Sequence, residues 1–162
     1  MRVRQLIAEK KFIQSETRWS TDDLPPRHAP IYQKTRPIRG GWKWRSAKAH
    51  NAEGVCYTLI VMCNPSKDNW KAMLVREADG GATSVVSRFE HHASHPGLHA
   101  HAHCQRSGIE IGPSSLDNLA RVPDNHKPHR RVVAWTESTF WEASKRFFHI
   151  ETNSGPLFTH AS

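Results

Sequence analysis

The apolar and polar positions in the middle of the chain predict an antiparallel meander of four strands. Residues 55–63 form a continuous apolar run that is rich in β-branched side chains, which is typical of a central strand. Turn-forming residues such as Asn, Pro, Asp and Gly then separate three further segments, 70–76, 82–90 and 98–104. We expect these segments to be the returning strands of the same sheet.

A stripe of apolar side chains predicts a helix over residues 137–148. Its spacing is helical, so we expect it to pack against the sheet as part of the core. Glu137 near the start and Arg146 near the end complement the helix dipole. Thr136 or Ser138 can cap the first turn. The stripe consists of Phe140, Trp141, Ser144, Phe147 and Phe148.

The N-terminal part of the chain has a different pattern. Residues 3–14 carry apolar side chains near helical spacing, which predicts a short amphipathic helix with Lys10 and Lys11 facing outward. Residues 21–41 are rich in proline, which fixes φ and removes backbone donors. We expect this segment to be extended and irregular, and either to wrap the domain or to order on binding.

Together these elements predict an α+β protein. We expect an antiparallel sheet of four to five strands packed against a C-terminal helix, with an extended basic N-terminal arm. The arm would comprise residues 1–45, and residues 46–162 would form a single domain.

The charge distribution changes the picture of what this protein binds. The chain has 162 residues and a formal net charge of +8. Residues 1–50 contain 12 Lys or Arg and 4 Asp or Glu, so the whole excess lies there. A one-sided positive field attracts polyanions, which makes nucleic acid the leading partner class, and RNA more so than DNA. An acidic protein, such as an inhibitor, is the alternative partner.

Two basic stretches supply candidate contacts to phosphates. In the first, Arg39, Lys43 and Arg45 lie beside Trp42 and Trp44. The tryptophans could stack on bases, but we favour a role in anchoring the arm to the core, because large aromatic side chains are usually mostly buried. The second stretch supplies Lys127, Arg130 and Arg131.

Six of the 12 histidines lie between residues 91 and 103, which suggests chemistry or metal binding. From Leu98 to Cys104 the histidines alternate with small or apolar residues. In a strand, His99, His101 and His103 would therefore share one face, about 6.6–6.8 Å apart along the chain. If this strand pairs with residues 82–90, Arg88 and Glu90 come alongside the histidines.

This grouping matches the needs of phosphodiester cleavage. His99, His101 and His103 would perform the acid–base steps, Glu90 would orient an imidazole, and Arg88 would stabilise the pentacovalent phosphate. RNA supplies its own nucleophile, the 2′-hydroxyl, so no metal is needed. The sequence thus predicts a small nucleic-acid-directed hydrolase, most simply a histidine-based ribonuclease.

Two alternatives stay open. The same three histidines could hold zinc, because imidazoles at alternate positions of one strand can share a cation. The protein would then be a zinc-dependent hydrolase; its other ligand would come from Glu90, His92, Cys104 or Asp117. Otherwise the histidine row is a solvated edge, and the protein is a non-catalytic module that binds nucleic acid or protein.

Residues 99–105, with the pattern His-Ala-His-Ala-His-Cys-Gln, resemble the signature of histidine-triad hydrolases and transferases. The resemblance implies that His101 is the nucleophile on an α-phosphate. Glu53, His101-x-His103 and Ser114-x-x-Asp117 also stand in the order found in JAMM-type zinc hydrolases. The general build is similar to that of small bacterial ribonuclease toxins.

Several classes are disfavoured by what the sequence lacks. No window approaches 18 consecutive apolar residues, and the N-terminus has no apolar run typical of a secretory signal. Three cysteines without a C-x-x-C motif argue against a disulfide scaffold and favour the cytoplasm. The sparse carboxylates argue against a two-magnesium nuclease.

Overall fold

The first seven strands of the described residues pair with one another in chain order and form one sheet. The computed structural model describes residues 3–92, 95–103, 119–122 and 134–152; for 3–4, 95–99, 101–103 and 119–122 this is the backbone alone. Within these residues the order is β7-β6-β5-β4-β3-β2-β1-β8. All neighbours are antiparallel except β1 and β8, which are parallel. The elements are α1 (Val3–Ala8), β1 (Lys11–Glu16), β2 (Lys43–His50), β3 (Cys56–Asn64), η1 (Pro65–Lys67), β4 (Asn69–Glu77), η2 (Asp79–Gly81), β5 (Thr83–His92), β6 (His95–His103), β7 (Leu119–Val122), α2 (Glu137–Phe147) and β8 (Ile150–Glu151).

The α+β class, the four-stranded meander and the C-terminal helix are confirmed. The meander corresponds to β3–β6, and α2 begins after Thr136, whose hydroxyl accepts a hydrogen bond from the Thr139 amide in a capping box. The predicted strand count was too low, because β1, β2, β7 and β8 extend the sheet to eight strands within the described residues. β1 and β8 are short, and their pairing joins distant parts of the chain, which local patterns do not reveal.

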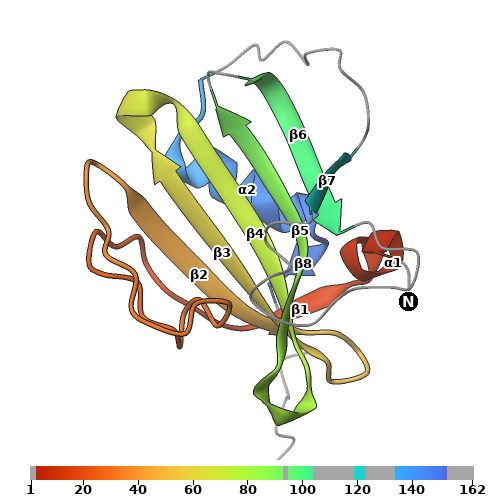
Figure 1. Cartoon of the computed structure of the whole chain (residues 1–162). Helices are drawn as coiled ribbons and strands as arrows, with labels where there is room; N and C mark the ends of the chain where they lie inside the picture. Colours follow the sequence, from red (N-terminus) through yellow and green to blue (C-terminus); the bar gives the residue numbers. More distant parts are fainter. Residues whose placement is uncertain (1–2, 93–94, 104–118, 123–133, 153–162) are drawn as a thin grey trace, which may run out of the picture.

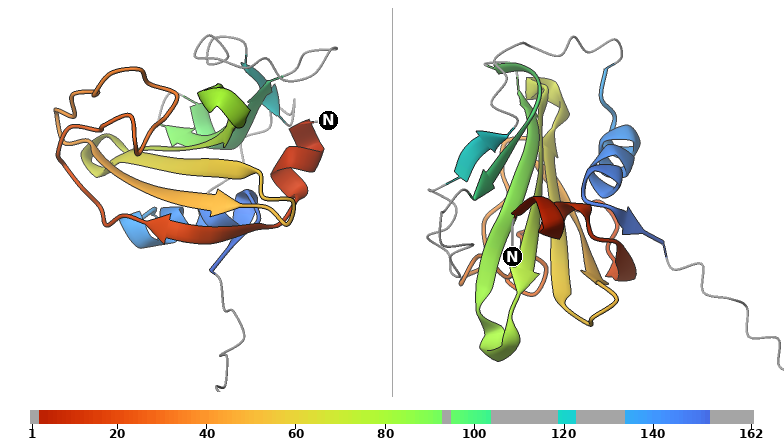
Figure 2. Two further views of the ribbon diagram at one scale, coloured as in Figure 1. Left: turned by 90° about the horizontal axis from the view of Figure 1, so that it is seen from below. Right: turned by 90° about the vertical axis from the view of Figure 1, so that its right-hand side faces the viewer.

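The sheet carries an apolar core on each face. On one face, α1 and α2 cover side chains from β2 to β5, and Phe140, Trp141 and Phe148 are fully or almost fully buried there. The Phe140 ring lies 5.6 Å from the Trp70 ring and 5.7 Å from the Phe89 ring. The apolar stripe predicted for the helix is therefore the core of this face. Figure 2 shows α2 on one side of the sheet and the segment between β1 and β2 on the other.

The proline-rich segment covers the second face (Figure 1, orange). Leu24 and Ile31 are buried against Trp44, Ile60 and Val75 of the sheet. Isolated bridges, Ser20 with Trp44 and Leu24 with Arg36, hold the segment in place. The segment therefore wraps the domain, which is one of the two arrangements expected from the sequence.

The prediction of an extended basic arm over residues 1–45 is not confirmed. Residues 11–16 and 43–50 are strands of the sheet, and the segment between them is a covering layer with its own apolar core.

The helix expected over residues 3–14 ends at Ala8, and Lys11 is buried in β1, contrary to the prediction that it faces outward. Its ammonium donates hydrogen bonds to the carbonyls of Ile7 (3.3 Å), Glu9 (2.8 Å) and Phe148 (3.1 Å). It also lies 5.1 Å from the centre of the Tyr57 ring. Burial lowers the pKa of Lys11 to about 8, partly opposed by the nearby Glu9 carboxylate.

No helix in the described part of the chain has the length and apolar character that a membrane span requires.

Candidate functional site

The backbone register places the histidine row beside Arg88 and Glu90. β5 and β6 are antiparallel, with His101 opposite Arg88 and His99 opposite Glu90. β7 then places Arg121 opposite His101 and Leu119 opposite His103. The expected pairing of the third and fourth meander strands is therefore confirmed. Ala100, between the histidines, is buried, as expected for the core side of the strand.

Glu90 is buried at the centre of this grouping. One of its carboxylate oxygens lies 2.9 Å from Nε of Arg88, and the other lies 3.5 Å from Nε2 of His92. The side chain of Glu90 is only 5% exposed, against 31% for Arg88. Glu90 therefore contacts both the guanidinium of Arg88 and the imidazole of His92.

Two rows of residues run across the strands from this grouping to the covered part of the same face. Opposite residues of an antiparallel pair share a face. One row leads from His101 through Arg88 and Met73 to Ile60. The other leads from His99 through Glu90 and Lys71 to Met62. The backbone positions of these two histidines thus continue the rows that cross the centre of the sheet.

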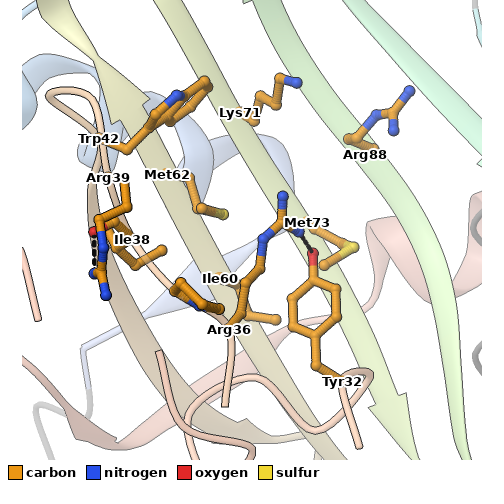
Figure 3. A pocket seen from close by; sticks show the side chains of 11 residues that line it. Tyr32, Arg36, Ile38, Arg39, Trp42, Ile60, Met62, Lys71, Met73 and Arg88 are labelled. Carbon is orange, nitrogen blue, oxygen red and sulfur yellow. Dashed lines mark hydrogen bonds between the residues drawn. The ribbon is translucent and has the colours of Figure 1, made fainter. Parts of the chain in front are cut away.

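A pocket of about 430 Å³ lies where this surface meets the proline-rich segment (Figure 3). This volume is in the range of small-ligand sites. Its floor is the apolar surface of β3 and β4, and the segment supplies one wall. The lining residues are Tyr32, Arg36, Pro37, Ile38, Arg39, Trp42, Ile60, Met62, Lys71, Met73 and Arg88.

The lining of the pocket is strongly cationic. It contains four Lys or Arg, and none of the described residues that line it is Asp or Glu. Figure 3 shows Arg36 reaching from the segment across the apolar floor, with Lys71 and Arg88 beyond it on β4 and β5. Positive charges that converge on one partly apolar space favour an anionic ligand.

The four cations differ in how far they are neutralised. Arg39 pairs with Asp23 at 2.5 Å, and Arg88 pairs with Glu90. Arg36 donates a hydrogen bond to the Tyr32 hydroxyl at 2.6 Å and lies over that ring at 5.0 Å. Lys71 lies over the ring of Trp42 at 5.5 Å. In the described part of the chain, Arg36 and Lys71 contact no carboxylate.

A glycine turn and Asp23 fix the pocket wall. Gly40 and Gly41 have φ of 65° and 83°, and the buried Asn64 side chain donates to the Gly40 carbonyl at 2.8 Å. This turn sets the place of Trp42 before β2 begins. Asp23 accepts hydrogen bonds from Arg39 and from the Ile38 amide at 3.2 Å. The Arg39 hydrogen bond, followed by that of the Ile38 amide, lowers the pKa of Asp23.

The tryptophans and their basic neighbours separate between the two faces. Trp44 is buried under the segment, and its indole donates to the Asp22 carbonyl at 2.7 Å, which fits the favoured anchoring role. Lys43 pairs with Glu137 at 2.5 Å, and Arg45 lies over the Trp141 ring at 4.1 Å. These two cations therefore lie against α2, on the face away from the pocket.

A second histidine contact lies on the α2 side of the sheet. His91 is buried, and its Nε2 lies 2.9 Å from an oxygen of Asp68, whose other oxygen accepts a hydrogen bond from the Trp70 indole at 2.9 Å. This arrangement closes the turn between β3 and β4 and is separate from the histidine row.

Other residues named from the sequence are placed elsewhere or lie outside the described residues. Glu53 is exposed in the turn between β2 and β3, and two strands, β4 and β5, separate it from β6. Among the described side chains, no group of three His, Cys, Asp or Glu is arranged to hold a metal ion. Six of the residues named from the sequence lie outside the described ranges: Cys104, Ser114, Asp117, Lys127, Arg130 and Arg131.

Sequence reasoning missed Tyr32, Arg36 and Lys71. Arg36 comes from a proline-rich segment and Lys71 from a strand, and only the packing of that segment on the sheet brings them together. The one available signal was the basic character of residues 1–50, which pointed to the correct region but to no particular side chain.

Comparison with known proteins adds no relative. No protein-family model matches the sequence, and neither a curated protein nor a solved structure matches it significantly.

Proposed function

We propose that this protein is a metal-independent ribonuclease that cleaves RNA with the histidines of β6. The observation that carries the proposal is the register of His101 opposite Arg88, in a row that continues into a cationic pocket. The backbone positions of the histidines, an arginine and a cationic pocket are then neighbours in the sheet.

The chemistry follows from these groups. One imidazole takes the proton of the 2′-hydroxyl, whose oxygen attacks the adjacent phosphorus. A second, protonated imidazole gives its proton to the departing 5′-oxygen. The products are a 2′,3′-cyclic phosphate and a 5′-hydroxyl, so protons and bonds balance without a water or a metal.

Arg88 is suited to stabilise the charge that develops on the phosphate. Glu90 contacts its Nε, and no other acceptor among the described residues takes its terminal nitrogens. Those nitrogens can donate two parallel hydrogen bonds to phosphate oxygens. Glu90 meanwhile contacts His92, and the register places His99 opposite it, which supports an orienting role.

The test is RNA cleavage in excess EDTA. We expect cleavage with cyclic phosphate ends, and no cleavage of DNA or of RNA methylated at its 2′-oxygens. His101→Ala should lower the rate by about 10²–10⁴-fold, the usual contribution of a general acid or base. His149→Asn is the matched control, because this histidine follows α2 and lies in a left-handed conformation (φ 52°) that asparagine accepts.

Two results would contradict the proposal. If EDTA abolishes cleavage and zinc restores it, the same histidines belong to a zinc-dependent hydrolase. If RNA is bound but not cut under either condition, the protein is a binding module.

A further inference from the structure

We propose that the pocket between the proline-rich segment and β3–β5 is a subsite for one nucleotide of single-stranded RNA, adjoining the cleaved bond. This inference rests on the proposed function and deepens it, because it names what the pocket holds. The nucleobase lies against the aromatic and apolar surfaces, and its phosphate lies between Arg36 and Lys71.

The composition of the pocket carries the first step. A ligand must satisfy two cations that no described carboxylate neutralises, and must also cover the apolar side chains of Ile60, Met62 and Met73. Inorganic phosphate would neutralise the two cations but leave the apolar floor exposed to water. A fatty acid would cover the floor, but its one carboxylate has no flat ring to lie against the aromatic side chains beside these two cations. A nucleotide has both a flat, weakly polar ring and a phosphate.

The aromatic side chains carry the second step. Trp42 and Tyr32 are both partly buried in the lining, and a cation lies over each ring: Lys71 over Trp42 and Arg36 over Tyr32. Base stacking on aromatic side chains combined with nearby cations is the usual way that proteins hold single-stranded nucleic acid. Each cation therefore lies beside a ring on which a base could stack.

Size and position carry the third step. A pocket of about 430 Å³ can take one nucleotide and excludes a duplex. Met73 on the floor is two strands away from residue 101 on β6, which corresponds to about 10 Å at the usual strand spacing. A nucleotide in the pocket therefore places its neighbouring phosphodiester at the Arg88–His101 position, and the pocket selects the base next to the bond that is cut.

The test measures binding apart from cleavage. The four nucleoside monophosphates, the matching nucleosides and inorganic phosphate are titrated into the full-length protein by isothermal calorimetry. We expect at least one monophosphate to bind about tenfold more tightly than its nucleoside and than phosphate, since tenfold corresponds to about 1.4 kcal/mol. Arg36→Gln and Lys71→Gln should each weaken this binding by about tenfold.

Two variants complete the design. Trp42→Leu should weaken monophosphate binding at least about fivefold through lost stacking. Lys145→Gln is the control: Lys145 lies on α2 and pairs with Glu142 at 2.9 Å, so this variant should change the affinity by less than twofold. Circular dichroism confirms that each variant folds. If Trp42→Leu does not fold, Arg36→Gln replaces it in the design, because the Arg36 side chain is exposed and its side-chain contacts are with Tyr32.

The outcomes separate this inference from the proposed function. If monophosphates bind no better than phosphate, or if the pocket variants bind as well as the wild type, the subsite is refuted even where RNA is cleaved. If monophosphates bind and the pocket variants weaken them, but EDTA-resistant cleavage is absent, the subsite stands and the ribonuclease proposal fails. His101→Ala should bind monophosphates like the wild type.

Discussion

Replacing Lys11 with methionine should change how the stability of this protein depends on pH. The Lys11 ammonium is fully buried among three carbonyls, and burial lowers its pKa to about 8 from an ordinary value of 10.5. A group with a lowered pKa binds fewer protons in the folded than in the unfolded state between these two values. Stability therefore rises as pH rises through this window.

The size of the effect follows from the two values. Integrating the proton linkage between pH 7 and pH 10 gives a gain of about 2.5 kcal/mol in the free energy of unfolding, at about 1.4 kcal/mol for each pKa unit. Other groups act in the opposite direction. Burial raises the pKa of Cys63 to about 12, and burial with the Glu9 contact raises that of Tyr57. Both oppose the gain once their unfolded forms ionise, above about pH 9.

The measurement compares variants, so that these opposing effects cancel. Urea unfolding followed by tryptophan fluorescence gives the free energy of unfolding of the wild type and of Lys11→Met at each pH. We expect the difference, wild type minus variant, to grow by about 2.5 kcal/mol from pH 7 to pH 10. Lys10→Met is the matched control, because Lys10 is exposed and pairs with Glu151 at 3.3 Å.

A difference that stays constant across this range would refute the reasoning. It would mean that the three carbonyls hold the ammonium charged at no cost, so that burial does not govern its protonation. A similar pH dependence for Lys10→Met would also refute it, because the effect would then not belong to the buried site.

Three further predictions test the parts that support the site. Gly41→Ala should lower the free energy of unfolding by about 1–2 kcal/mol, because φ of 83° is unfavourable for alanine, although the new methyl group meets Asn64 and Ser66 at ordinary contact distances. Urea unfolding measures this loss, and an unchanged midpoint would contradict it. Thr136→Ala should lower the free energy of unfolding by about 1 kcal/mol through the lost capping box of α2, whereas Ser138→Ala, two residues further along, should lower it clearly less. Lys43→Gln should lower the free energy of unfolding by only about 0.2–1 kcal/mol, since the pair of Lys43 with Glu137 is partly exposed. It should reduce RNA affinity much less than Lys71→Gln does. Equal losses of RNA affinity in a filter-binding assay would contradict the assignment of these two lysines to opposite faces of the sheet.

The meander and the C-terminal helix could be predicted because their signals are local. The apolar run of β3 and the turn residues after it lie within a few positions of each other, as do Thr136 and the stripe of α2. The register of β5 against β6 also followed from a short connection, which placed Arg88 and Glu90 beside the histidine row.

β1 and the environment of Lys11 could not be predicted in the same way. The apolar residues of 3–14 fit a helix, but the chain leaves the helix after Ala8 and pairs with β2 and β8 instead. Lysine is rarely buried, and the carbonyl of Phe148 that helps to hold it comes from 137 positions further along the chain.

The pocket could not be predicted from the sequence for a similar reason. Its wall and its floor come from segments that are joined only by packing, and the sequence contains no phosphate-loop motif to indicate it.

If the pocket holds a ligand as proposed, any opening of the layer formed by residues 20–39 would weaken its binding. This layer supplies Tyr32 and Arg36, so when it detaches from the sheet the cavity no longer exists. Any molecule held there must bind the closed form alone, and its apparent dissociation constant rises in proportion as the closed fraction falls. A bound ligand should in turn slow proteolysis of this layer, so that ligand binding increases the resistance of the protein to degradation.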